Sequence, residues 1–134
     1  MVTVKKDEST FSVDIEKTRN YYKTHSLCNC ENCRNFYAQI KNNFPELDRF
    51  LSEFGVDISK PDEASSVEAD NYIDYLTVYY SVCGRSEAPN AYEIDILDKS
   101  PLHVTIGGEY APNEQVGDYF MITVTGIKLP LVLE

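Results

Sequence analysis

The chain has 134 residues, 43% of them hydrophobic, and a formal net charge of −10 from 12 Lys and Arg against 22 Asp and Glu. This length fits one domain, which can bury a core without a metal or disulfide merely to fold. The acidity predicts no nucleic-acid partner and no membrane-surface partner, because affinity for both depends largely on Lys and Arg. A protein partner with a basic surface is compatible with this charge.

Residues 1–10 contain Lys5, Lys6, Asp7 and Glu8 and lack the apolar core of a secretory signal. We therefore expect them to form a short flexible lead-in. No apolar run approaches the roughly 20 residues of a membrane span. Cysteines clustered in sequence, without a signal peptide, are typical of a reducing compartment. Together these features predict a cytoplasmic protein.

The residue pattern divides the single predicted domain into a helical half (11–56), an acidic connector (57–70) and a strand-rich half (71–134). The connector is expected to be a solvated loop, because its acidic residues outnumber its single Lys60 and the following Pro61 disfavours helix. Helices followed by strands indicate an α+β fold. We predict N-terminal helices packed on one face of a mostly antiparallel sheet of four or five strands.

Three helices are expected in the first half. The first begins after Asp14, a favoured N-cap residue, and ends near Thr24. The second begins inside the cysteine cluster and runs to about Asn43, because its apolar residues recur three and four positions apart. The third begins at Pro45, a residue suited to the first helical turn, and ends before Gly55, a common helix stop.

Four strands are expected in the second half, at 72–83, 92–96, 102–106 and 120–125, because apolar and polar residues alternate there. The alternation predicts which side chains face the helices: Leu76, Val78, Ile94, Ile96, Val104, Ile106, Ile122 and Val124. The apolar tail, 127–133, contains Pro130, which confines it to a sheet edge or to an extended packed arm.

Three cysteines close together in sequence carry the most specific chemistry. Cys30 and Cys33 have the spacing of a zinc knuckle, in which a tight turn presents two sulfurs to one metal. Cys28 adds a third sulfur, and thiolate-rich sites favour Zn²⁺ over hard cations. The fourth ligand is either His25, which precedes the cluster, or Cys83, which ends the first predicted strand. The sequence therefore predicts a zinc site at this cluster.

Two other interpretations of the cysteines remain open. Cys30-x-x-Cys33 at a helix start resembles a thiol redox motif, because a helix N-terminus lowers thiol pKa. The βαβ pattern that usually accompanies such a motif is missing here. Alternatively, the cysteines are small reduced residues that pack the second helix onto the sheet.

Motifs distributed along the chain resemble those of a group of small bacterial hypothetical proteins, well represented in low-GC Gram-positive bacteria. The motifs are Cys-x-Cys-x-x-Cys-Arg-Asn-Phe (28–36), Phe-Pro (44–45), Phe-Gly-Val-Asp-Ile-Ser-Lys-Pro-Asp-Glu (54–63), Val-Cys-Gly (82–84) and Leu-Pro (129–130). The resemblance covers nearly the whole chain. It implies a bacterial source, and no activity is established for that group.

A second candidate site lies on the polar faces of the predicted strands. Tyr75 and Tyr79 share the polar face of the first strand, and tyrosine rings add contact area at low entropic cost. Glu93, Asp95 and His103 lie on the polar faces of the next two strands, in a pattern compatible with an acid–base patch or a weak cation site. A solvated sheet face produces the same pattern. We take these residues as a candidate recognition surface.

The chain shows no nucleophile elbow, no phosphate-binding glycine loop and no His-x-x-x-His pair. We therefore predict a non-catalytic binding or interaction module whose cysteine cluster is a candidate structural zinc site. The alternative is a thiol-dependent redox enzyme or sensor that uses Cys30 and Cys33.

The net charge of −10 leads us to expect no binding of nucleic acid at physiological salt. The densest basic group, Lys17, Arg19 and Lys23, is too small to overcome the field of the whole chain. The test is a fluorescence-anisotropy titration with single-stranded RNA and duplex DNA at about 150 mM salt, where the Debye length is ~8 Å. A saturable, salt-sensitive rise at micromolar protein would contradict this expectation.

Overall fold

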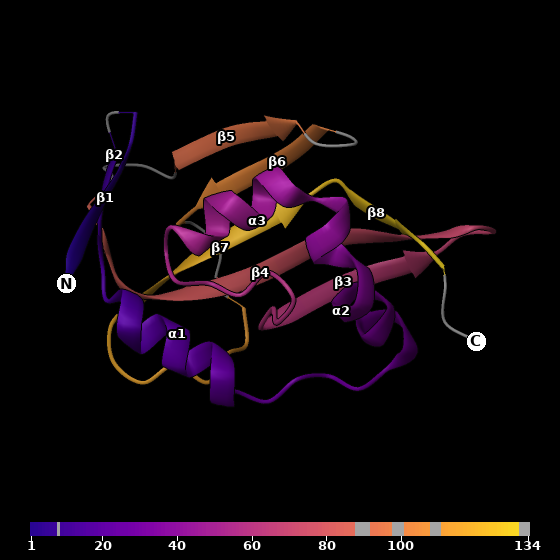
Figure 1. Ribbon diagram of the computed structural model, residues 1–134, viewed down its shortest axis with the longest axis horizontal. Coiled ribbons are helices and arrows are strands. Elements are labelled where there is room, and N and C mark those ends of the chain that lie inside the picture. The colour runs from indigo at the N-terminus through magenta and orange to yellow at the C-terminus, as the bar shows by residue number, and fades with distance from the viewer. Residues whose placement is uncertain (8, 88–91, 98–100, 108–110, 132–134) are drawn as a thin grey trace.

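A computed structural model describes residues 1–7, 9–87, 92–97, 101–107 and 111–131 of the chain. Within these ranges, three helices and eight strands form an α+β structure in which all strand pairs are antiparallel (Figure 1). The fold class agrees with the sequence analysis, but the sheet has more strands than the four or five expected. None of the helices in the described part of the chain is long and apolar enough to cross a membrane.

The helices and the four expected strands lie close to their predicted positions. In chain order the elements are β1 (Val2–Lys6), β2 (Ser9–Val13), α1 (Ile15–Thr24), α2 (Glu31–Asn43), α3 (Pro45–Ser52), β3 (Glu63–Glu68), β4 (Tyr72–Ser86), β5 (Tyr92–Leu97), β6 (Pro101–Ile106), β7 (Tyr119–Thr125) and β8 (Ile127–Pro130). Asp14 is the N-cap of α1, as predicted, and its side chain accepts a hydrogen bond from the Lys17 N–H. The tail forms β8, a short strand that ends at Pro130.

Two regions that we expected to be irregular contain strands. The predicted lead-in, 1–10, forms β1 and the start of β2, which pair as an antiparallel hairpin. The predicted connector, 57–70, contains β3, which pairs with β4. Both β1 and β3 have largely exposed side chains. Their sequences therefore lack the apolar alternation by which the inner strands were predicted.

The central element of the sheet is β4, a strand of 15 residues. One of its edges pairs with β2 and β3, and the other pairs with β7 and β8. Beyond β7 the sheet continues to β6 and β5. The three helices lie on one face of this sheet, in front of the strands in Figure 1.

A β-bulge in β4 reverses the side-chain alternation that the sequence suggested. The pairing of β3 with β4 shifts between Ser65 and Ser66, so Leu76 of β4 is the extra residue. Val78 after the bulge and Tyr75 before it are consequently both buried on the helix side. The prediction that Leu76 belongs to the core is wrong, because its side chain is 48% exposed.

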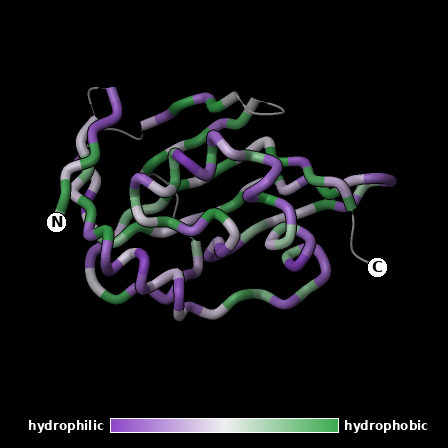
Figure 2. The backbone as a smooth tube through the Cα atoms, viewed as in Figure 1, coloured by the Kyte–Doolittle hydropathy of each residue, from purple (hydrophilic) through white to green (hydrophobic). Residues whose placement is uncertain are grey.

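The core lies between the helices and the sheet, and Figure 2 shows hydrophobic stretches along the strands behind the helices. Six of the predicted core residues are buried there: Val78, Ile96, Val104, Ile106, Ile122 and Val124. Ile94 is partly buried against the same cluster. At one end of the core, the ring of Phe11 contacts Phe54, Tyr92 and Phe120 at centroid distances of 5.8, 6.0 and 5.6 Å. These ring contacts join β2, β5 and β7 to the segment after α3.

Between β2 and β3, the edge of β4 is completed by side chains instead of a strand. The Thr18 hydroxyl in α1 accepts a hydrogen bond from the Cys83 N–H at 3.1 Å. Tyr22 donates to the Ser81 carbonyl at 2.7 Å, and Asp62 accepts from the Ser81 N–H at 2.7 Å. These contacts satisfy backbone groups that would be costly to bury alone.

Gly84 permits the close approach of β2 to β4. Its φ is +142°, a backbone conformation that L side chains rarely adopt. A Cβ at this position would lie 2.0 Å from the Ser12 carbonyl oxygen. The pairing of Val13 with Gly84 therefore depends on glycine.

We expect Gly84→Ala to lower the free energy of unfolding by about 3 kcal/mol, because backbone strain and steric overlap add together. Gly117→Ala is the matched control, since its φ is +92° but an added Cβ would meet only the Lys17 ammonium at 3.5 Å. For the control we expect about 1 kcal/mol from strain alone. Urea unfolding monitored by circular dichroism measures both values, and equal losses would contradict the close approach of β2.

Candidate functional site

The three clustered cysteines lie where the loop after α1 enters α2. Cys30 is the N-cap of α2, and its sulfur accepts a hydrogen bond from the Cys33 N–H at 3.4 Å. The sulfurs of Cys28, Cys30 and Cys33 all lie within 4.8 Å of one another. In a tetrahedral thiolate site with Zn–S bonds of ~2.3 Å, the sulfurs are about 3.8 Å apart. The three cysteines are therefore close enough to hold one metal ion.

Hydrogen bonds from α2 to the preceding loop and between α2 and the sheet support this cluster. The Tyr37 hydroxyl donates to the Cys28 carbonyl at 2.7 Å. The Tyr75 hydroxyl in β4 donates to the Asn32 carbonyl, and the Asn32 side chain donates to the Ser66 hydroxyl in β3 at 3.0 Å. The first turn of α2 is thus attached to two strands, so the cysteines are carried on a fixed support.

The buried Asn35 side chain and the Gln39 side chain attach the same helix to the end of the sheet. Asn35 donates to the Pro130 carbonyl at 3.0 Å, and Gln39, one turn further along α2, donates to the same oxygen at 2.6 Å. These two bonds hold α2 to β8. They fix the orientation of the helix whose N-terminus carries the thiols.

Cys30 and Cys33 differ in their tendency to ionise. Burial raises the pKa of the Cys33 thiol, and contacts with the Cys30 and Cys28 sulfurs raise it further. Slight burial acts to raise the pKa of Cys30, but hydrogen bonds from the Cys33 N–H and the neighbouring thiols outweigh it and lower that pKa. Cys28 and Cys30 are exposed, whereas Cys33 is half-buried. The exposed N-cap sulfur of Cys30 is therefore more acidic than an ordinary thiol.

His25 does not join the three sulfurs. Its ring stacks on Tyr21 with a centroid distance of 4.7 Å, and Nδ1 lies 3.2 Å from the Tyr21 carbonyl oxygen. Nε2 is buried and has no hydrogen-bond partner within the described ranges. The group of mutually close ligand atoms contains the cysteine sulfurs and not this imidazole.

Cys83, the other residue considered as a fourth ligand, is also separate from the cluster. It is buried, and its thiol donates to the Gln115 side-chain oxygen at 3.0 Å. Gln115 in turn donates to the Ser81 hydroxyl at 2.9 Å. Cys83 is thus part of the packing between β4 and the segment before β7.

The candidate recognition surface is only partly assembled. Tyr75 is fully buried under α2, so its assignment to a surface is wrong. The cause is the bulge at Leu76, which puts Tyr75 and Tyr79 on opposite faces of the sheet. Tyr79 is half-buried on the face away from the helices, where it pairs with Thr123.

His103, Asp95 and Glu93 do form a connected group on that far face. The His103 ring lies between the two carboxylates, with Nδ1 2.8 Å from Asp95 and Nε2 3.0 Å from Glu93. All three side chains are exposed. Hydrogen bonds that the ring donates to Asp95 and, second, to Glu93 raise the pKa of His103.

Sequence analysis missed two residues beside the cysteines. Tyr37 and Asp62, together with Glu63, line a hollow of about 270 Å³ next to Cys28 and Cys33. Asp62 accepts hydrogen bonds from both Tyr21 and the Ser81 N–H, and so joins α1 to β4. Asp62 belongs to an acidic segment that we interpreted as solvated loop, and no local pattern distinguished it from its neighbours.

Comparisons with family models, with curated proteins and with solved structures gave no significant match. The fold and the cluster define an α+β domain with three thiols grouped at a helix N-terminus.

We expect the NMR-titrated pKa of His103 to lie above its unperturbed value of about 6.5, because two carboxylates bind the protonated ring. The protonated ring then stabilises the fold fully below the unfolded-state pKa, and this contribution is lost as pH rises through the folded-state pKa. Asp95→Asn should lower the His103 pKa by removing the first carboxylate. A wild-type pKa at or below the unperturbed value would contradict the ion pairs.

Proposed function

We propose that this protein is a non-catalytic binding module in which Cys28, Cys30 and Cys33 hold one structural Zn²⁺ ion. The observation that supports this most strongly is the set of three sulfurs within 4.8 Å of one another. Thiolates select zinc over magnesium or calcium. All four cysteines of the chain are free, as a protein of a reducing, cytoplasmic compartment requires.

The ligand set of this proposal is three thiolates and an open fourth position. His25 is stacked on Tyr21, and Cys83 is engaged by Gln115, so the proposal assigns neither to the metal. Exposed Cys28 and Cys30 leave the remaining position accessible to water or to a group from another molecule. Bound zinc would tie the loop after α1 to the first turn of α2. Because thiols must lose their protons, binding weakens as pH falls.

The surface offered to a protein partner is the far face of the sheet, which carries Tyr79 on β4 and Glu93, Asp95 and His103 on β5 and β6. The cross-strand pairs Tyr79–Thr123, Thr123–Thr105 and Thr105–Glu93 put Tyr79 and Glu93 at the two ends of one row across the sheet. The pair Asp95–His103 lies in the next row. The net charge of −10 favours approach of a basic partner. Tyrosine is enriched at protein interfaces, and polar groups form the rim around them.

A thiol redox function is the second candidate, and one observation favours it. Cys30 is exposed at a helix N-terminus and has a lowered pKa, while half-buried Cys33 has a raised pKa. An acidic attacking thiol next to a less acidic one is the arrangement of dithiol redox sites. In that reaction the Cys30 thiolate attacks a substrate disulfide, forms a mixed disulfide and releases one substrate thiolate. The Cys33 thiolate then attacks the Cys30 sulfur, which forms the Cys30–Cys33 disulfide and releases the second substrate thiolate.

Protein purified from zinc-supplemented culture should contain one zinc per chain by elemental analysis. Cys30→Ser should lower that stoichiometry, because it removes one of three ligands. Cys83→Ser is the matched control, since its sulfur lies outside the cluster, and it should retain the metal. Metal-free wild-type protein that takes up no zinc, or equal zinc in both variants, would refute the proposal.

Thiol labelling separates the two candidate functions. In the zinc-bound protein the three clustered thiols should react slowly with an alkylating reagent and should become reactive after a chelator removes the metal. In a redox protein, Cys30 reacts rapidly whether or not a chelator is present. Rapid labelling of purified protein without chelator therefore favours the second function.

Zinc should raise the melting temperature only modestly. A ligand that binds the native state alone stabilises it by about 2.7 kcal/mol at a hundredfold excess over its Kd. Here the ligands fall within six residues, 28–33, so the unfolded chain retains much of the same affinity. The metal content is consequently a better readout of the site than the melting temperature.

A further inference from the structure

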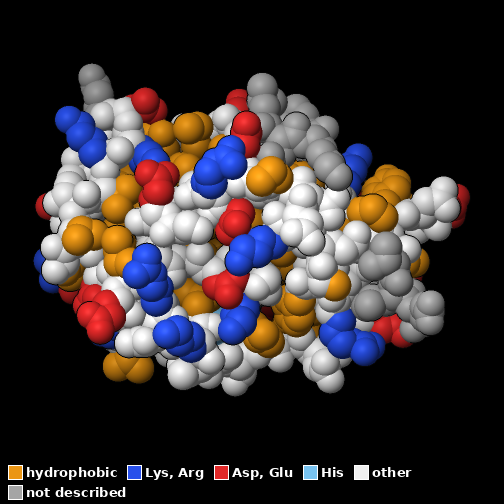
Figure 3. Space-filling view, in the orientation of Figure 1, with side chains coloured by type: hydrophobic (Ala, Val, Ile, Leu, Met, Phe, Trp, Pro, Cys, Tyr) orange, Lys and Arg blue, Asp and Glu red, His pale blue; other side chains and the backbone are white. Residues whose placement is uncertain are grey.

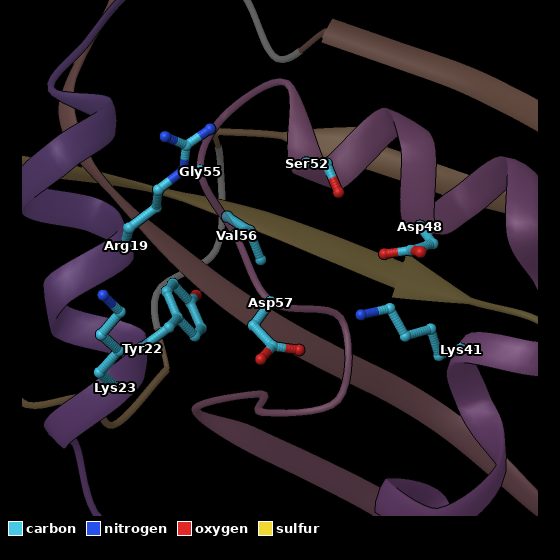
Figure 4. A pocket seen from close by; sticks show the side chains of 9 residues that line it. All are labelled: Arg19, Tyr22, Lys23, Lys41, Asp48, Ser52, Gly55, Val56 and Asp57. Atoms are coloured by element: carbon cyan, nitrogen blue, oxygen red, sulfur yellow. The ribbon is translucent and has the colours of Figure 1, made fainter.

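A separate hollow of about 280 Å³ lies between the three helices. It is on the face of the molecule that the helices cover (Figure 1). Figure 3 shows Lys and Arg side chains gathered over this helix side, although acidic residues outnumber basic ones in the chain. The hollow is lined by Arg19, Tyr22, Lys23, Lys41, Asp48, Ser52, Gly55, Val56 and Asp57 (Figure 4). It shares no residue with the cysteine cluster.

The basic side chains of this hollow come from different helices and have no ion-pair partner within the described ranges. Arg19 and Lys23 belong to α1 and Lys41 to the last turn of α2. The recorded ion pairs of Lys and Arg join Lys6 with Glu53, and Arg85 with Asp118. Three cations thus line one small space without an acidic partner in contact.

The floor of the hollow is buried backbone and ring. Gly55 and Val56 follow α3, and Tyr22 of α1 is 2% exposed. Gly55 has φ +83°, and a Cβ there would lie 2.8 Å from the Ile15 carbonyl oxygen. Glycine therefore allows the turn after α3 to lie against α1, which forms this floor. Charges next to buried protein interact more strongly than charges surrounded by water.

Two carboxylates complete the lining. In Figure 4, Asp48 and Lys41 point into the hollow from one side, and Asp57 lies between them and the α1 residues. The Oδ1 atom of Asp57 accepts from the backbone and the hydroxyl of Ser59, at 3.0 and 2.6 Å. The three cations of the lining still outnumber its two carboxylates. The carboxylate oxygens can accept hydrogen bonds from hydroxyl groups of a bound molecule.

We propose that this hollow binds a phosphate dianion, either free or as a small hydroxyl-bearing phosphomonoester. A phosphate group carries close to two negative charges and three strong acceptor oxygens near neutral pH, so it offers one oxygen to each of the three unpaired cations. The Arg19 guanidinium can bind two oxygens at once, and Lys23 and Lys41 act as point charges. Asp48 and Asp57 offset part of the positive charge, so phosphate is favoured over a simple carboxylate by its third acceptor oxygen and not by net charge. The cations exclude a metal ion.

The test is an NMR titration of the ¹⁵N-labelled full chain with sodium phosphate at pH 7.5 and constant ionic strength. We expect saturable shifts at the amides of Gly55 and Val56, with millimolar or tighter affinity. Glycerol phosphate forms a second arm. Tighter binding of glycerol phosphate would assign the site to a phosphomonoester, and tighter binding of inorganic phosphate would assign it to the free ion.

Lys41→Gln and Arg19→Gln should each weaken phosphate binding about tenfold, as expected for loss of one hydrogen bond to a charged group. Arg34→Gln is the matched control. Arg34 is an exposed residue near the other end of α2 and lies outside the lining, and its substitution changes the net charge equally. An unchanged fold in each variant is verified by the remaining amide resonances.

Lowering the pH to 5 should weaken phosphate binding and leave sulfate binding nearly unchanged, because phosphate becomes a monoanion below its second pKa of about 6. Three results would overturn the proposal. They are non-saturable shifts spread over the surface, an equal loss in Arg34→Gln, or no loss in either Lys41→Gln or Arg19→Gln.

Discussion

The length of β4 is the constraint on which the rest of the structure depends. A strand of 15 residues is longer than any one partner strand here, so several elements must share its hydrogen-bonding groups. Where β2 ends and β3 begins on one edge, Thr18, Tyr22 and Asp62 take the place of a strand. This requirement fixes α1 against the sheet. The turn after α3 then packs on α1, because Gly55 allows contact with the Ile15 carbonyl.

Local signals in the sequence predicted the helices well and the strands unevenly. Asp14, Pro45 and Gly55 mark helix ends through interactions confined to a few residues, and the structure has helix boundaries beside them. Alternation of apolar and polar residues indicates the inner strands, because one face of each of them is buried. The outer strands β1 and β3 bury little and carry no such signal. The bulge at Leu76 depends on pairing with β3, so neither it nor the burial of Tyr75 follows from β4 alone.

The same distinction applies to the candidate site. Proximity of Cys28, Cys30 and Cys33 follows from sequence spacing and from a helix that begins at Cys30. The positions of His25 and Cys83 depend on long-range packing, and the sequence left both open as fourth ligands. The packing of His25 on Tyr21 and the contact of Cys83 with Gln115 settle their geometry. Supporting residues such as Tyr37 likewise cannot be identified from the local sequence, because their role depends on the residues that they contact in the folded protein.

The cysteine cluster and the hollow between the helices lie at opposite ends of α2, so the helix dipole has opposite effects on charges at the two sites. The N-terminus of a helix favours negative charge, which suits a thiolate at the N-cap residue Cys30. The C-terminus favours positive charge, which suits Lys41 in the last turn. An anion in the hollow would therefore approach an unfavourable helix end, and it requires cations from a second helix to overcome this. Arg19 and Lys23 of α1 meet that requirement, and α1 is held in place by its hydrogen bonds to β4. The long strand β4 thus holds α1 in place, and α1 carries the two cations, Arg19 and Lys23, that the hollow needs to bind an anion.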